Sequence, residues 1–227
     1  MRALIALAGL RPSPTVLTGL ETGLKSCDLV LAADGGLDLL LAAGLTPQAY
    51  YGDSDSVSTK NLEKAGELGV PRFLSPQEKN FTDGEAAVQA ALERGCDRLL
   101  IWTSFGATRP DHVLANIMYW ADLAKAKKLQ VEVTDGRQWL TFVTPDRPFK
   151  LAVEELSEQQ AAGYFSLIPL LGACSGVNLK GFYYPLKAAD IPVGSTRGVS
   201  NRLAAKADRL EVSLTDGVLA LYLVAED

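Results

Sequence analysis

Short apolar runs alternate with longer stretches of helical spacing through the first half of the chain. A chain that alternates strands with helices builds a parallel sheet covered by helices, so this alternation constrains the fold more than any other feature. The runs that predict strands are residues 3–8, 29–33, 49–51, 72–74, 99–102 and 131–134. The stretches that predict helices are residues 36–43, 59–66, 83–94 and 110–127. We therefore expect an α/β N-terminal domain with a mostly parallel sheet.

The pattern changes after about residue 140, where helical spacing is lost except for a short polar piece at 154–161. Strand-like runs follow at residues 164–168, 173–179, 198–203, 209–214 and 217–224. The dipeptide Asp216-Gly217 separates the last two runs and is typical of a hairpin turn. We expect an all-β sandwich over residues 145–227, preceded by the α/β domain over residues 1–144.

Composition excludes several classes of protein. The chain has 22 basic and 27 acidic residues, a net charge of −5, which argues against a nucleic-acid partner. No apolar stretch approaches the roughly 18–20 residues that span a bilayer, so no membrane association is expected. Three scattered cysteines and one histidine leave no cysteine- or histidine-based metal site and favour a reducing, cytoplasmic location.

Aspartates and glycines follow four of the predicted strands. In open α/β sheets, ligands bind at the carboxyl ends of the strands. Each motif alone is also typical of a structural turn or helix cap, but four on one sheet edge favour a ligand site. The segments are Asp34-Gly35-Gly36, Gly52-Asp53-Ser54-Asp55-Ser56, Lys79-Asn80-Phe81-Thr82-Asp83 and Phe105-Gly106-Ala107-Thr108-Arg109-Pro110-Asp111-His112.

Asp53 and Asp55 are the most informative pair, because residues two apart on an extended segment point the same way. Two such carboxylates repel each other unless a cation lies between them, and Mg²⁺ accepts carboxylate oxygens together with substrate phosphates. Asp83 is placed to join the metal, and Arg109 to hold a phosphate. The sequence has no P-loop and no G-x-G-x-x-G motif. For His112, a structural role in the loop and a general-base role both remain open.

These motifs, and the order in which they follow one another along the chain, resemble those of the bacterial thiamine pyrophosphokinase family. The resemblance extends past Arg109-Pro110-Asp111-His112 and Asn116 to motifs in the second half of the chain. These are Ser166-Leu167-Ile168-Pro169-Leu170, Tyr184-Pro185-Leu186 and Gly198-Val199-Ser200-Asn201. The resemblance implies a nucleotide-binding α/β domain, a thiamine-binding sandwich and a homodimer. It also implies transfer of a pyrophosphoryl group from ATP to the hydroxyl of thiamine, which releases AMP.

The resemblance also implies roles for individual residues. Those expected to bind Mg²⁺ are Asp53, Asp55 and Asp83, and the catalytic set adds Arg109 and Asp111. Those expected to bind ATP are Asp34, Gly35, Gly36, Gly52, Lys79, Asn80, Thr82, Gly106, Arg109 and Asn116. Ser200 and Asn201 are expected to meet thiamine.

Three positions depart from the family pattern. Asn80 stands where the family usually has Asp, Arg202 replaces the usual Glu, and Ala107-Thr108 replaces a Gly-rich pair. Alternative interpretations are a related pyrophosphokinase acting on another hydroxymethyl heterocycle, such as a pterin, and a nucleotide- or thiamine-binding protein without turnover. A third is a structural sandwich on a generic α/β domain, which would leave five aspartates at the strand ends unexplained.

Overall fold

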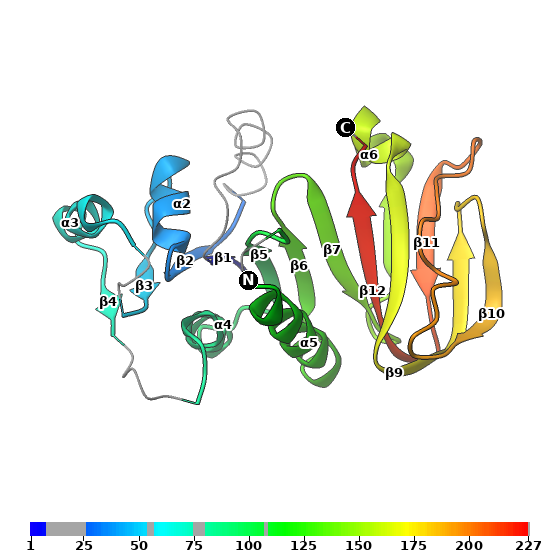
Figure 1. The fold of residues 1–227 in the computed structure, drawn as a ribbon, viewed down its shortest axis with the longest axis horizontal. Helices are drawn as coiled ribbons and strands as arrows, with labels where there is room; N and C mark the ends of the chain where they lie inside the picture. Colours follow the sequence, from blue (N-terminus) through cyan, green and yellow to red (C-terminus); the bar gives the residue numbers. More distant parts are fainter. Residues whose placement is uncertain (8–25, 54–56, 75–79, 107–108, 227) are drawn as a thin grey trace. The chain divides into compact units, whose positions relative to one another are not determined.

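The computed structural model describes residues 1–7, 26–53, 57–74, 80–106 and 109–226, and Figure 1 shows their course. They group into two compact units. The first comprises residues 1–110 and 133–136, and the second comprises residues 111–132 and 137–227. The functional boundary expected between residues 144 and 145 stays a prediction.

The first unit contains a sheet of parallel strands in the order β4-β3-β2-β1-β5, which confirms the predicted α/β region. Among the described residues of this unit, three helices accompany the sheet. The α2 helix contacts β1 and β2, the α4 helix contacts β1, β2 and β3, and Figure 1 shows these two helices on opposite sides of the sheet. The strands are β1 (Arg2–Ala6), β2 (Leu29–Ala33), β3 (Ala49–Tyr51), β4 (Arg72–Phe73) and β5 (Arg98–Trp102), and the helices are α2 (Gly36–Ala42), α3 (Thr59–Glu67) and α4 (Asp83–Glu93).

Buried apolar side chains from strands and helices form the core of the first unit. Leu4 on β1, Leu40 on α2 and Trp102 on β5 belong to this core, and each is at most 1% exposed. Burying each such side chain contributes roughly 1.5–3 kcal/mol. At the end of β1, a Cβ on Gly36 would lie 2.0 Å from the carbonyl oxygen of Ala6. Only glycine therefore allows α2 to begin so close to the carboxyl end of the sheet.

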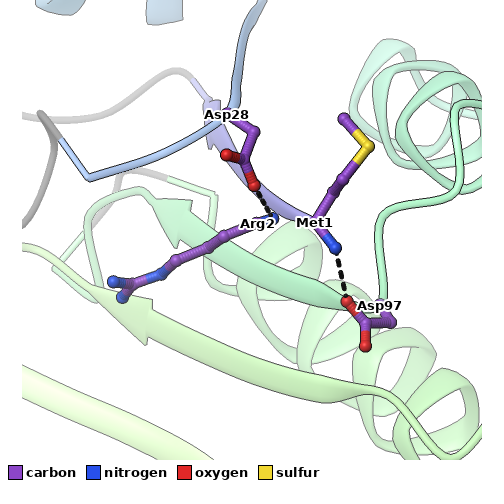
Figure 2. A network of polar contacts seen from close by, with 4 residues as sticks. All are labelled: Met1, Arg2, Asp28 and Asp97. Atoms are coloured by element: carbon purple, nitrogen blue, oxygen red, sulfur yellow. Dashed lines mark hydrogen bonds and ion pairs between the residues drawn. The ribbon is translucent and has the colours of Figure 1, made fainter.

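Polar contacts fix the start of β1 (Figure 2). The amino group of Met1 lies 2.9 Å from a carboxylate oxygen of Asp97, and the backbone N–H of Arg2 donates to Asp28 over 2.7 Å. The hydrogen bond from the Met1 ammonium lowers the pKa of Asp97. Asp28 and Asp97 precede β2 and β5, so both neighbours of β1 are held in register at this end.

The second unit consists mainly of antiparallel strands, which confirms the predicted all-β region. Its strand order is β7-β12-β9-β11-β8, with β10 paired to β9. No helix among the described residues is long and apolar enough to span a membrane. The remaining elements are α5 (Pro110–Ala126), β6 (Gln130–Thr134), β7 (Gln138–Val143), β8 (Phe149–Ala152), η1 (Val153–Glu155), α6 (Glu158–Ala162), β9 (Tyr164–Lys180), β10 (Leu186–Ile191), β11 (Arg209–Ser213) and β12 (Asp216–Val224).

A single long strand, β9, joins the two sheets of the second unit. Its first part pairs with β12, and its last part pairs with β10 and β11. The sequence predicts two separate strands here, and the residues between them form an irregularity around Leu171 and Gly172, both of which have positive φ. Side chains such as Phe165, Val177 and Leu221 fill the core of the sandwich.

The hairpin predicted at Asp216-Gly217 is wrong. The β11 and β12 strands do not pair with each other in the described structure, and each pairs with β9 instead. Gly217, with φ +103, lies at the register shift between β12 and β9. A Cβ there would lie 2.7 Å from the Sγ atom of Cys174. The glycine therefore serves a close approach of two strands rather than a tight turn.

Candidate functional site

The ends of β2 and β3 meet at Asp34 and Gly52. Asp34 has φ 48, and its backbone N–H donates to the carbonyl oxygen of Tyr51 over 3.0 Å. Gly52 has φ +149, and a Cβ built on it would lie 2.9 Å from Oδ1 of Asp34 and 2.7 Å from the hydroxyl of Tyr50. The predicted nucleotide residues Asp34 and Gly52 are therefore in direct contact.

Asp83 lies at the start of α4 and is only 8% exposed. The preceding Thr82 is the N-cap, and its Oγ1 accepts the backbone N–H of Glu85 over 3.1 Å. A Cβ on Gly84 would lie 3.2 Å from a methyl group of Leu7, the residue that follows β1. The first turn of α4 therefore packs against the carboxyl end of the sheet, and this brings Asp83 to the edge where ligands bind in open α/β folds.

Asp53 is exposed and directly follows Gly52. Asp55, its predicted partner, lies outside the described residues, as do Lys79, Ala107 and Thr108. Within the described ranges, no three His, Cys, Asp or Glu side chains form a group that could hold a metal ion. The carboxylate oxygens of Asp53 and Asp83 are nevertheless the donor type that Mg²⁺ prefers.

The loop after β5 begins with Ser104, a buried residue that the sequence analysis did not single out. Its Oγ accepts the backbone N–H of Gly106 over 3.2 Å and thus shapes the start of the loop. Arg109 is exposed at the end of this loop. Asp111, His112 and Asn116 belong to the second unit, where the first two are exposed and Asn116 is half-buried. Both roles considered for His112 stay open.

In the second unit, Asn201 is only 4% exposed, and its side chain forms hydrogen bonds with backbone groups. Its Oδ1 accepts the N–H groups of Tyr184 and Arg202, each over 2.9 Å, and its Nδ2 donates to the carbonyl of Tyr184 over 2.8 Å. The neighbouring Ser200 is exposed, has φ 60, and donates its N–H to the Oγ of Ser166 over 3.0 Å. Asn201 therefore holds the backbone of Tyr184 beside Ser200.

An aromatic pair adjoins these two residues, and of the pair the sequence analysis named Tyr184 but not Tyr183. Tyr183 and Tyr184 are each 64% exposed, and their rings meet edge to face with centroids 4.8 Å apart. Both rings therefore present aromatic surface to solvent. The signal in the sequence was the tyrosine doublet itself. Arg202 stacks its guanidinium 4.4 Å from the ring centroid of Tyr164 and donates a hydrogen bond to the Tyr164 hydroxyl.

A second missed residue, Asp38, links the segments after β2 and β3. Its carboxylate accepts the hydroxyl and the backbone N–H of Ser58 over 3.0 and 3.3 Å, and Nδ2 of Asn61 over 2.7 Å. Asp38 lies on α2, whereas Ser58 and Asn61 begin α3. A lone aspartate in an apolar helix gives no sequence signal of such a contact.

Two family models match this chain. Residues 20–133 match the catalytic domain of thiamin pyrophosphokinase, and residues 154–219 match the thiamin pyrophosphokinase vitamin B1 binding domain. Over 175 residues, the chain is 28% identical to a thiamine pyrophosphokinase of Bacillus subtilis, and the match covers 77% of this chain and 78% of the relative.

Crystal structures of thiamine pyrophosphokinases share the fold of this chain. A thiamine pyrophosphokinase crystal structure from Bacillus subtilis superposes with a TM-score of 0.83 at 25% identity over the full length of both chains. One from Geobacillus thermodenitrificans superposes with a TM-score of 0.80 at 25% identity and covers 100% of this chain and 99% of the other.

Proposed function

The chain belongs to the thiamin pyrophosphokinase family, and we propose that it transfers a pyrophosphoryl group from ATP to the hydroxyl of thiamine, giving thiamine diphosphate and AMP. The observation that carries this proposal is the presence, in order on one chain, of the catalytic match and the vitamin B1 binding match. Members of this family are ATP-dependent diphosphotransferases.

We assign Mg²⁺ to Asp53, Asp55 and Asp83. The buried position of Asp83 and the location of Asp53 two residues after the end of β3 support this assignment. When bound, the metal would neutralise charge on the phosphate oxygens, which is the main requirement of phosphoryl transfer. The hydroxyl of thiamine needs a base as it attacks, and we assign that role to one of these aspartates.

We assign ATP to the segments at the carboxyl ends of the strands. The contact between Asp34 and Gly52 and the cap of Thr82 on α4 support a shaped site there. The first turn of α4 offers backbone N–H groups, which attract phosphate oxygens. The proposed nucleotide residues are Asp34, Gly35, Gly36, Gly52, Lys79, Asn80, Thr82, Gly106, Arg109 and Asn116, and Asp111 and Arg109 would act on the transferring group.

We assign thiamine to Ser200, Asn201 and the adjoining tyrosine pair. The pair offers aromatic faces to a planar cationic ring, an interaction worth roughly 0.5–1 kcal/mol at an exposed site. The Oδ1 atom of Asn201 already accepts two backbone N–H groups. Asn201 therefore contributes to thiamine binding by holding Tyr184 in place. We also propose that the protein acts as a homodimer in the cytoplasm.

A turnover assay with ATP, Mg²⁺ and thiamine tests the proposal, with AMP and thiamine diphosphate read by mass spectrometry. We expect both products in equal amounts. Binding of ATP without formation of thiamine diphosphate would contradict thiamine as the acceptor and direct the search to other hydroxymethyl heterocycles. A control that replaces thiamine with a hydroxymethyl pterin separates these two acceptors in the same experiment.

A further inference from the structure

Ser200 has an uncommon backbone conformation at an exposed position of the second unit. Its φ of 60 lies in the left-handed region, which serine rarely adopts because its Cβ would approach the following carbonyl oxygen. Residues in such conformations persist only where neighbouring groups hold them, and they are concentrated at functional sites. The contacts that hold Ser200 in this conformation therefore bear on its function.

The segment that carries Ser200 is bound to the first part of β9. The N–H of Leu167 donates to the carbonyl of Gly198 over 2.9 Å. Phe165 and Asn201 exchange two backbone hydrogen bonds, of 2.9 and 2.8 Å. A Cβ on Gly198 would lie 2.4 Å from the carbonyl oxygen of Leu167, so the two segments are in close contact. The chain is thus attached to β9 on both sides of Ser200.

Ser166 makes the contact to Ser200 itself. Its Oγ accepts the N–H of Ser200 over 3.0 Å. The three neighbouring hydrogen bonds join backbone groups, whereas this one depends on the residue type at position 166. Ser166 lies on the stretch of β9 that pairs with β12 from residue 164 to residue 170, so the sheet fixes its position. A side chain on a rigid strand therefore holds the residue with the left-handed backbone.

The contact with Ser166 uses the backbone of Ser200 and leaves its side chain to other partners. Among the described residues, the Ser200 hydroxyl has no hydrogen-bond partner. The next residue, Asn201, holds the backbone of Tyr184 through its side chain. Ser166 and Asn201 therefore fix two neighbouring parts of the proposed thiamine site, the first through Ser200 and the second through Tyr184.

We propose that Ser166 is a positioning residue for the acceptor, which acts by holding Ser200 in the left-handed conformation that directs its hydroxyl to thiamine. This inference rests on the proposed function, because Ser200 is assigned to thiamine there. A residue that is already held in its binding geometry loses less conformational freedom when the ligand binds. Without the acceptor oxygen of Ser166, the backbone of Ser200 is free to leave the left-handed region, which turns its side chain away.

The test compares Ser166→Ala and Ser166→Thr with the unchanged protein in the turnover assay. Ser166→Ala removes the acceptor of the Ser200 N–H, whereas Ser166→Thr keeps a hydroxyl at the same position. We expect Ser166→Ala to raise KM for thiamine by about 3- to 10-fold, the range typical of one lost hydrogen bond, and to leave KM for ATP unchanged. Ser166→Thr should return KM for thiamine to near its original value. An unchanged KM for thiamine in Ser166→Ala overturns the inference.

A double variant shows whether Ser166 acts through Ser200. Ser200→Ala removes the hydroxyl but keeps the backbone N–H that Ser166 accepts. If Ser166 positions this hydroxyl, adding Ser166→Ala to Ser200→Ala raises KM for thiamine no further. Rises that add fully in the double variant overturn the inference, because Ser166 would then act independently of the Ser200 side chain.

Ser157→Ala is the matched control. The Oγ of Ser157 also accepts a backbone N–H, that of Gln160 over 3.2 Å, at the start of α6 in the same unit. We expect this variant to lower the melting temperature without raising KM for thiamine. A rise equal to that of Ser166→Ala would overturn the inference, because a general loss of stability would then explain both.

Ser166→Val replaces Ser166→Ala if the latter does not fold, because valine favours strands and has nearly the shape of threonine. A higher KM for thiamine in Ser166→Val than in Ser166→Thr supports the inference, and equal values overturn it. Failure of the proposed function gives a different result, since the unchanged protein would then form no thiamine diphosphate. Hydrogen exchange of the Ser200 amide, followed by NMR, would still show whether Ser166 holds this residue.

Discussion

The carboxylate of Asp34 occupies the space that a side chain on Gly52 would need. A Cβ there would lie 2.9 Å from Oδ1 of Asp34 and 2.7 Å from the Tyr50 hydroxyl. Gly52 also has φ +149, a backbone conformation that other residues rarely adopt. Both this conformation and the close contacts therefore require glycine at this position. The two strand ends can approach this closely only with glycine here.

Gly52→Ala should therefore displace Asp34 and lower turnover strongly. A displacement of about 1 Å at a reacting site costs on the order of 100-fold in rate, and we expect a loss of that size. Steady-state kinetics with ATP as the varied substrate measures it. Gly44→Ala is the control, because Gly44 has φ +71 but a Cβ on it would meet no other atom within 4 Å. An equal loss in both variants would show that backbone strain alone is responsible.

Asp53→Ala and Asp83→Ala should each abolish turnover while the fold is retained. Both remove a carboxylate from the proposed metal site, where removing a like charge relieves repulsion in the metal-free protein. Asp53 is exposed, so we expect its loss to leave the melting temperature nearly unchanged. The exposed Asp122 on α5 provides an Asp→Ala control outside the proposed site. AMP production near the normal rate in both site variants would contradict the metal assignment.

Asn80→Asp restores the residue usual in the family and should change turnover only modestly. An amide oxygen can ligate Mg²⁺ as a carboxylate does, so the added negative charge would mainly strengthen metal binding. We expect the Mg²⁺ requirement to fall and the maximal rate to stay within a few-fold. The measurement is turnover across a Mg²⁺ titration. Activity that appears only in this variant would instead support a binding protein without turnover.

Stability should fall at alkaline pH because of Cys174. Burial raises the pKa of this thiol above its ordinary value of 9.0. A raised pKa means that the thiol's contribution is present below pH 9.0 and is lost as the pH rises toward the folded value. Urea unfolding between pH 7 and 10 should show this decline. Cys174→Ala should flatten it, whereas Cys27→Ala, at a half-buried position, should not.

Local patterns predicted the α/β region well because its strands and helices follow each other along the chain. The helix predicted over residues 83–94 is present as α4, capped by Thr82, and the strand predicted over residues 99–102 is present as β5. The second unit was harder, because its pairings join distant segments. The residues of β9 pair with both β11 and β12, so Asp216-Gly217 was misread as a local hairpin. Contacts such as that between Asp38 and Ser58 depend on helix placement, which no local pattern encodes.

Asn201→Ala should lower both stability and the affinity for thiamine. The change removes the partner of the Tyr184 N–H and C=O groups and of the Arg202 N–H. An unpaired buried polar group costs about 1–3 kcal/mol, but Tyr184 is exposed enough for water to replace part of what is lost. We therefore expect a loss of about 2 kcal/mol in the free energy of unfolding, measured with urea.

The KM for thiamine distinguishes a purely structural role of Asn201 from a role that also supports thiamine binding. Without Asn201, the Tyr183–Tyr184 pair loses its fixed backbone, so KM for thiamine should rise while KM for ATP stays unchanged. Asn178→Ala is the matched control, since Asn178 also joins backbone groups, those of Gly176 and Ala188, in the same unit. It should cost stability without raising KM for thiamine. If both variants leave KM for thiamine unchanged, the tyrosine pair does not contact the acceptor, because only Asn201→Ala disturbs its support.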